Sequence, residues 1–248
     1  MKLNMKPTTL LSKSLISLAA LATLGGCASV NIDQSIDRAN LETKTIAGAA
    51  TQLLRTAEAK TVRDLQVAEL LKSPLNQQAA VQLAIINSPA LQTMLAERWL
   101  DMAQAAQGGR IANPILSLER MRSLDELEYG RILAFGLLDL ITLPQRKKIA
   151  MARMAQTELQ MTADVVGLIS KVRMAWVAAV AASESATYSK LVYESAQASA
   201  ELAKRMQTVG NFNRLQRARQ QAFYADASIQ LLASQHTATA TREALVRL

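Results

Sequence analysis

Apolar residues in the second half of the chain recur at steps of three and four residues, the spacing of one face of an α-helix. The pattern begins after Pro144 and continues to Gln207 without another proline. A single helix over residues 145–207 would reach about 95 Å at 1.5 Å per residue, which predicts a coiled-coil arm or part of a tall bundle. The residues that carry the pattern are Met154, Met161, Val165, Leu168, Val172, Trp176 and Val180.

The helical pattern is broken at residues 208–213. Gly210 and Asn211 supply the left-handed backbone that ends a helix, and Asn213 can cap the next one. The pattern resumes at Arg214, so residues 144–248 predict a long antiparallel helical hairpin with its tip at 208–213. The face of the returning helix that we expect to be packed consists of Leu215, Ala218, Ala222, Ala225, Ile229 and Leu232.

Upstream, residues 75–112 predict a further helical segment. It opens after Pro74 and ends at Gly108–Gly109. Pro89 follows Ser88 inside this segment and predicts a kink, or a break with a fresh cap. Residues 27–74 are assigned to an N-terminal segment.

Between Pro114 and Pro144 the apolar period shortens to two. The alternation predicts strands at 115–121 and 131–141, with a polar connector at 122–130. In the first strand we expect Leu116 and Leu118 on one face and Ser117 and Glu119 on the other. Each strand is close to the length that crosses a membrane when tilted. We therefore expect a β-hairpin at 113–143, and a fold that is mainly α with this one two-stranded hairpin.

Residues 1–26 predict a signal peptide. Lys2, Lys6 and Lys13 precede an uncharged run that is too short to span a bilayer. The run ends in Leu24-Gly25-Gly26-Cys27, which resembles a bacterial lipobox, and Cys27 is the single cysteine of the chain. We expect Cys27 to be acylated and, because Ala28 follows it, the chain to reside in the outer membrane. The alternative is a simple cleaved signal with an incidental cysteine.

The composition of the chain limits the kinds of functional site that it can have. One Cys and one His exclude a disulfide framework and make metal or relay sites improbable. Export argues against nucleic acid as the partner of the net charge of +8. Asp125, Glu126 and Glu128 are interpreted as a solvated loop, and His236 as a surface residue. We expect no enzyme activity, no cofactor and no metal.

Two clusters of basic residues each have two possible roles. Residues 146–148, Arg-Lys-Lys, form either a solvated first helical turn or an anchor near lipid headgroups. Arg214, Arg217 and Arg219 either meet acidic groups of a partner or simply keep the helix soluble. Trp176 and the methionines are interpreted as packing residues of a helical seam rather than as a ligand site.

The order and spacing of four motifs resemble the TolC-like outer-membrane efflux factors, many of which are lipoproteins, over roughly residues 75–235. The motifs are Asn87-Ser88-Pro89-Ala90-Leu91, Gly109-Arg110-Ile111-Ala112-Asn113-Pro114, the run from Phe135 to Pro144, and Val209-Gly210-Asn211. The resemblance implies a trimer with a barrel in the outer membrane above a periplasmic tunnel of antiparallel helices. Residues 75–112 would be an ascending tunnel helix.

The resemblance also implies partners. The tunnel's inner end would dock on a periplasmic adaptor protein that is driven by an inner-membrane transporter. The expected adaptor-binding tip consists of Thr208, Val209, Gly210, Asn211, Phe212, Asn213, Arg214 and Leu215. Family tips usually carry a small or apolar residue after the glycine, so Asn211 and Phe212 are a departure.

The family normally repeats the strand–hairpin–helix unit twice, and one copy is found here. Two strands leave open edges that lipid cannot satisfy. We therefore expect a truncated chain; the alternative is that about six copies close one wall. A rival function is a periplasmic, lipid-anchored coiled-coil scaffold without a pore.

Overall fold

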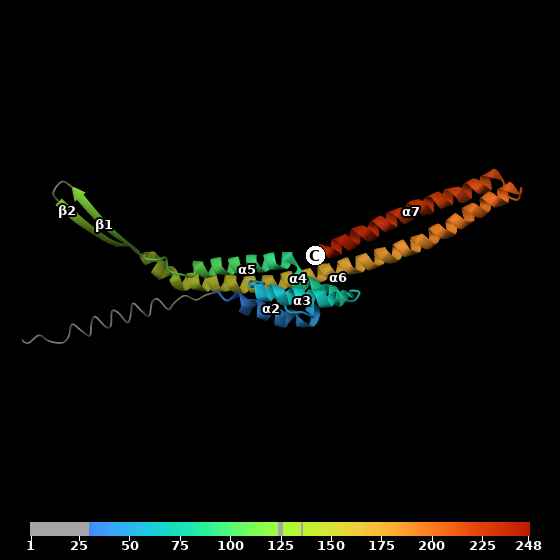
Figure 1. The fold of residues 1–248 in the computed structure, drawn as a ribbon. Helices are drawn as coiled ribbons and strands as arrows, with labels where there is room; N and C mark the ends of the chain where they lie inside the picture. Colours follow the sequence, from blue (N-terminus) through green and yellow to red (C-terminus); the bar gives the residue numbers. More distant parts are fainter. Residues whose placement is uncertain (1–29, 124–125, 135) are drawn as a thin grey trace, which may run out of the picture.

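The computed structural model describes residues 30–123, 126–134 and 136–248. The molecule is elongated, with a β-hairpin at one end and the turn between its two longest helices at the other (Figure 1). The elements in chain order are α2 (Ile32–Ala47), α3 (Ala57–Leu70), α4 (Gln77–Asn87), α5 (Pro89–Gly108), β1 (Ile115–Ser123), β2 (Glu126–Ala134), α6 (Leu137–Thr208) and α7 (Arg214–Val246).

Helix α6 has 72 residues and is therefore about 108 Å long. It begins eight residues before the predicted start at 145 and continues through Pro144. A proline removes one backbone hydrogen bond and bends a helix, but near the first turns the remaining bonds hold the helix together. The prediction that the helix begins after Pro144 was therefore wrong.

The β-hairpin is present, but its strand boundaries differ from the predicted ones. β1 continues two residues past the predicted end at 121, and β2 begins at Glu126, inside the predicted connector 122–130. Strands β1 and β2 pair antiparallel, with Ile115 opposite Ala134 and Ser123 opposite Glu126. The predicted second strand at 131–141 was wrong, because the chain from Leu137 onward is helical. The apolar residues at 133, 137, 140 and 141 fit a helical spacing as well as a partly alternating one, so the period alone did not fix the boundary.

The hydrophobic core lies beside the middle of α6, where α2, α4 and α5 pack against it (Figure 1). Large aliphatic side chains fill it: Ile32, Ile36, Val81, Ile85, Leu91, Leu95, Met102, Met161, Val165, Ile169 and Val172 are almost fully buried. Polar contacts reinforce the packing. Trp176 donates from its indole nitrogen to the Leu75 carbonyl at 3.0 Å, and Arg173 donates to the Ile46 carbonyl at 2.9 Å.

The N-terminal segment 27–74, for which the sequence analysis named no element, contains α2 and α3. Asn31 caps α2 by accepting a hydrogen bond from the Asp33 amide, and Gly48 ends the helix at a φ of 69°. The α2 residues Ile32, Ile36, Ala39, Thr43 and Ala47 are buried at steps of three and four. This spacing, bounded by a cap residue and a glycine, is a signal that identifies the helix from the sequence.

The predicted break at Pro89 is confirmed. Helices α4 and α5 meet at Ser88 with a bend of 50°. Ser88 caps α5 by accepting from the Leu91 amide, and Pro89 occupies the first position of the helix, where its missing N–H costs nothing.

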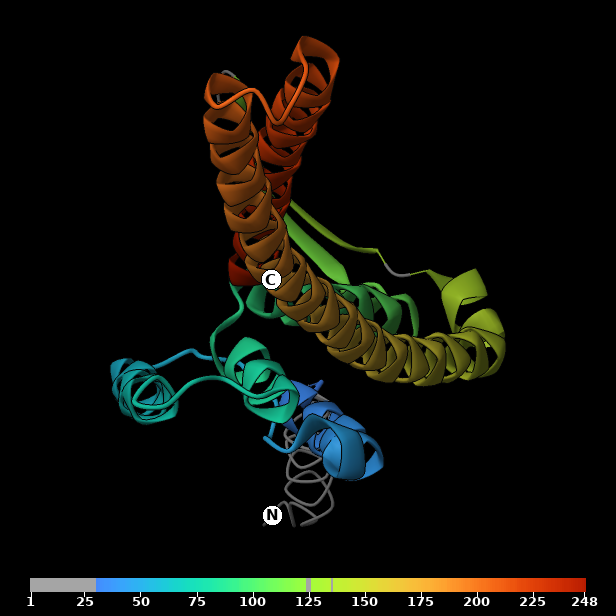
Figure 2. The same cartoon turned by 90° about the vertical axis from the view of Figure 1, so that its right-hand side faces the viewer.

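Helices α6 and α7 form the predicted antiparallel hairpin and lie side by side over the outer part of α6 (Figure 2). Their seam follows a seven-residue repeat. On α6 the buried residues are Ala182, Ser189, Ala196 and Ala203. These small side chains let the two backbones approach closely. At the centre, the Tyr193 and Tyr224 hydroxyls lie 3.1 Å apart, and this hydrogen bond raises the pKa of Tyr193.

The face of α7 that contacts α6 differs from the predicted one. The residues of α7 that are buried or half-buried are Gln220, Tyr224, Ala227, Ser228, Leu231, Ser234, Ala238, Thr241 and Leu245. The predicted residues Leu215, Ile229 and Leu232 are instead 60–67% exposed. The prediction followed the spacing of apolar residues alone, whereas the packed face also includes polar residues such as Gln220, Ser228 and Ser234. Val180 of α6, also predicted to pack, is 39% exposed.

Candidate membrane hairpin and partner-contact tip

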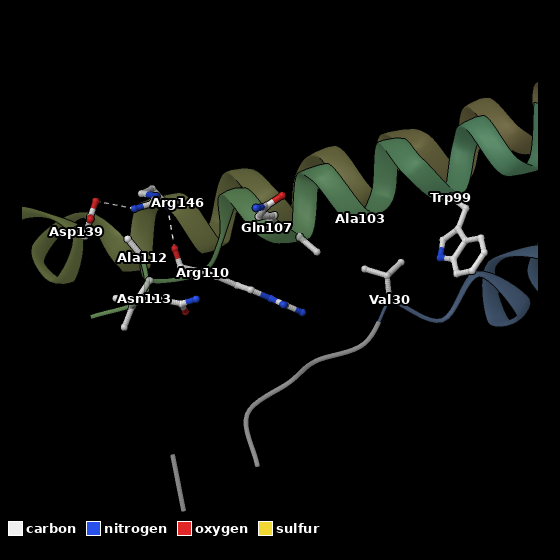
Figure 3. A pocket seen from close by; sticks show the side chains of 11 residues that line it. Val30, Trp99, Ala103, Gln107, Arg110, Ala112, Asn113, Asp139 and Arg146 are labelled. Carbon is white, nitrogen blue, oxygen red and sulfur yellow. Dashed lines mark hydrogen bonds and ion pairs between the residues drawn. The ribbon is translucent and has the colours of Figure 1, made fainter. Parts of the chain in front are cut away.

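The β-hairpin joins the helical body at a junction held by Arg146. Its guanidinium donates to the Gly108 carbonyl at 3.0 Å, to the Arg110 carbonyl at 2.9 Å and to the Asp139 carboxylate at 2.9 Å (Figure 3). These partners belong to the end of α5, the lead into β1 and the first turn of α6. Arg146 therefore fixes the direction in which the hairpin leaves the body, a role that neither sequence interpretation of this basic cluster included. Lys147 and Lys148 are exposed.

Close packing supports the same junction. A Cβ on Gly109 would lie 2.9 Å from the Ala150 Cβ, so glycine is what allows the end of α5 to touch α6 here. Beside the junction is an open hollow of about 730 Å³ whose walls include Val30, Trp99 and Arg110 (Figure 3). Trp99 lies under the guanidinium of Arg55, at 5.2 Å from ring centre to Cζ.

Both faces of the β-hairpin are uncovered. Among its apolar residues the exposed fraction runs from 43% at Leu127 to 71% at Leu118. The apolar surface continues into the first turns of α6, where Leu137, Leu138 and Ile141 are 65–71% exposed. Water-soluble proteins rarely leave such a contiguous apolar surface uncovered, so this end of the molecule requires an apolar environment or a partner.

Register divides the hairpin into two chemically different faces. One face, the leucine–arginine face, carries Leu116, Leu118, Arg120, Arg122, Leu127, Tyr129, Arg131 and Leu133. The other, the glutamate face, carries Ile115, Ser117, Glu119, Met121, Glu128, Gly130, Ile132 and Ala134. The expectation that Leu116 and Leu118 share a face is confirmed, and Leu133 joins them. Glu126 and Glu128 lie in β2, not in the solvated loop expected for them, and Asp125 lies outside the described residues.

At the opposite end, the predicted tip is a compact turn. Helix α6 ends at Thr208, Gly210 adopts a φ of 81°, and the Asn211 amide donates back to the Met206 carbonyl at 2.9 Å. Asn213 and Gln216 form a reciprocal capping box at the start of α7, both bonds at 2.8 Å. The turn is therefore fixed by its own hydrogen bonds.

The eight predicted tip residues form one continuous surface. Thr208, Val209, Gly210, Asn211, Asn213, Arg214 and Leu215 are exposed, and Phe212 is half-buried. Of the three tip arginines, Arg217 donates to Gln207 across the turn at 2.8 Å. The tip thus offers backbone, amide and cationic groups to a partner, with Val209 as its most exposed apolar side chain at 70%.

Other predicted features are placed as follows. Cys27 and the signal peptide lie outside the described residues. His236 is exposed. Within the described ranges no cluster of three or more His, Cys, Asp or Glu side chains could hold a metal ion. By length and hydropathy alone, α6 is the one described helix that could cross a membrane unaided, and α4 with α5 would qualify as a bent pair.

Comparison of the chain with protein-family models, with curated proteins and with solved structures finds no match. The resemblance to TolC-like factors therefore stays a prediction from the order of its motifs.

Proposed function

We propose that this chain is an outer-membrane component of a tripartite efflux or type I secretion system. In this role it is a passive conduit subunit. Its hairpin stands in the outer membrane, its helical rod extends into the periplasm, and its tip docks on a periplasmic adaptor coupled to an inner-membrane transporter.

One observation carries the proposal: a single helix connects an apolar hairpin at one end to a polar, self-capped turn at the other. The hairpin and the first turns of α6 expose leucine and isoleucine side chains, as a lipid-facing segment does. The tip is polar and fixed, as a docking surface in water should be. The distance between them, about 108 Å along α6, suits a part that spans a compartment.

The proposal also requires further copies of the chain. The two-stranded sheet has an open edge on each strand, and in lipid each unpaired backbone group would cost several kcal/mol. Exposed apolar residues extend along both long helices, among them Tyr188, Leu191, Leu202, Phe223 and Leu232. Neighbouring copies would pair the strand edges and cover these helix faces, which makes a homo-oligomer the functional form.

Site-directed labelling tests the topology in the full chain. Leu127→Cys places a thiol near the hairpin turn, and Val209→Cys places one at the tip. With a bulky, membrane-impermeant maleimide, we expect the hairpin cysteine to react on intact cells and the tip cysteine to react only after the outer membrane is permeabilised. If both cysteines are protected on intact cells and both react afterwards, the hairpin is periplasmic and the scaffold function replaces the conduit.

Photo-crosslinking tests the partner. A photoreactive residue at Val209 should crosslink to the periplasmic adaptor, whereas one at Tyr188, equally exposed but far from the tip, should not. Equal crosslinking at the two positions would place the adaptor along the rod and contradict docking at the tip.

A further inference from the structure

The three arginines of the hairpin form one cluster on one face. Arg120 and Arg122 are two residues apart on β1, which separates them by about 7 Å. Arg131 lies opposite Leu118 and diagonal to Arg120, at a typical spacing of about 7–8 Å. Within the described residues, none of these side chains forms an ion pair; Arg120 lies over the Tyr129 ring at 6.0 Å.

Among the residues that the structure describes, the cluster has no acidic neighbour on its own face. The hairpin's described carboxylates, Glu119 and Glu128, point to the opposite side of the sheet. All three arginines are exposed. An exposed, unpaired group of three guanidinium ions is suited to phosphate, whose oxygens accept paired hydrogen bonds from Arg.

The order of residues along this face indicates which kind of phosphate compound would bind to it. From the base of the hairpin toward its turn, the paired positions read Leu116 with Leu133, Leu118 with Arg131, Arg120 with Tyr129, and Arg122 with Leu127. Three of the four leucines thus lie toward the base, whereas Arg120, Arg122 and Tyr129 lie toward the turn, beside Leu127. The same order is found from the hydrocarbon core of a membrane to its headgroup layer, where aromatic and cationic side chains concentrate. Arg131 lies opposite Leu118, closer to the base of the hairpin. It can reach the headgroup layer by extending its side chain along the sheet.

We propose that the leucine–arginine face binds phosphate-bearing membrane lipid. Acyl chains lie against Leu116, Leu118 and Leu133, and the lipid phosphates pair with the arginine cluster. The glutamate face then points away from lipid, toward the interior of the assembled wall. This proposal rests on the proposed function, because it needs the hairpin to enter a membrane.

Vesicle flotation of the full chain tests the proposal. Partitioning is compared between vesicles of phosphatidylcholine and vesicles that also contain phosphatidylglycerol. The acyl anchor is the same in every variant, so the ratio of the two partition coefficients reports the preference for anionic lipid, whose phosphate charge is not neutralised by a choline group. Each basic residue near an anionic surface contributes about fivefold to binding, so we expect R120Q/R122Q/R131Q to lower the ratio by up to about 100-fold.

Two variants serve as controls. R214Q/R217Q/R219Q makes the same charge change at the tip and should leave the ratio unchanged. R120K/R122K/R131K keeps the charge and should retain the electrostatic part of the preference, while losing the paired hydrogen bonds that only Arg makes. Unchanged binding of the glutamine variant to phosphatidylcholine vesicles is the control for its folding.

The remaining outcomes overturn the proposal in distinguishable ways. Persistence of the preference in R120Q/R122Q/R131Q, or an equal loss in the tip variant, would mean that net charge rather than this face recognises lipid. Displacement by soluble inorganic polyphosphate, with binding to phosphatidylcholine vesicles intact, would assign the face to a soluble polyanion. If maleimide labelling shows that the hairpin is periplasmic, the proposed function fails together with this inference. If the hairpin is labelled from outside the cell but the vesicles show no lipid preference, only this inference is rejected.

Discussion

The two halves of α6 are packed in different ways. Around Met161 and Ile169 the helix contacts three other helices through large, fully buried aliphatic side chains. From Ala182 to Ala203 it contacts α7 through alanine and serine at seven-residue intervals. Burial of large apolar side chains contributes most of a protein's stability, whereas a seam of small residues buries little area per contact. The comparison indicates a body that is more stable than the arm.

The largest effect should come from the body. Leu95→Ala removes a side chain with no solvent exposure and should lower the free energy of unfolding by about 3 kcal/mol. Leu100→Ala, on the same helix but 56% exposed, is the matched control and should change it little. Chemical denaturation followed by circular dichroism measures both. Equal effects would mean that Leu95 is not part of a packed core.

The seam should respond to added volume. Ala196→Leu inserts a larger side chain between α6 and α7 and should cost about 2 kcal/mol, because a close-packed seam cannot accommodate it. Ala198→Leu, exposed two residues away, should be nearly neutral. We expect hydrogen exchange to accelerate in α7 and the outer part of α6 but not in α5. Acceleration throughout the chain would show that arm and body unfold as one unit.

Loss of the hydrogen bonds of Arg146 should destabilise the chain only near the junction. Arg146→Gln removes the donors that satisfy two backbone carbonyls and Asp139, at a cost of about 1–2 kcal/mol. Lys147→Gln removes the same charge from an exposed neighbour and is the control. Hydrogen exchange at residues 108–112 should increase in the first variant only. An increase in both would assign the effect to charge rather than to the three hydrogen bonds.

The smallest effect is expected at the tip. Asn213→Ala removes the capping box of α7 and should cost about 1 kcal/mol, measured as faster exchange in the first turn of that helix. Asn211→Ala keeps the cap and should leave the exchange unchanged. If the two variants behave alike, the turn is not held by its cap.

Local signals explain what could be predicted from the sequence. Gly210 and Asn213 mark the tip with residue types that a helix end and a helix start require, and Ser88–Pro89 marks the bend between α4 and α5 in the same way. Alternation at Leu116 and Leu118 identified the face that these residues share. Each of these features depends on neighbours within a few residues.

The features that were missed depend on tertiary contacts. The packed face of α7 mixes small and polar residues with a few large ones such as Tyr224, so apolar spacing alone selected the uncovered face around Ile229 and Leu232. The role of Arg146 depends on carbonyl groups more than 30 residues away in the chain. The end of β2 was misplaced because the leucines after Ala134 fit a helix as well as a strand.

The seven-residue repeat of the α6–α7 seam restricts how this arm can change in length. Removing or adding one residue rotates everything beyond it by about 100° and turns the small side chains away from the other helix. Seven residues on each helix restore the alignment almost completely, so homologous arms should differ in steps of about 10 Å. The reach of the rod is thus a discrete quantity, and partners that meet its tip must match one of a few allowed lengths.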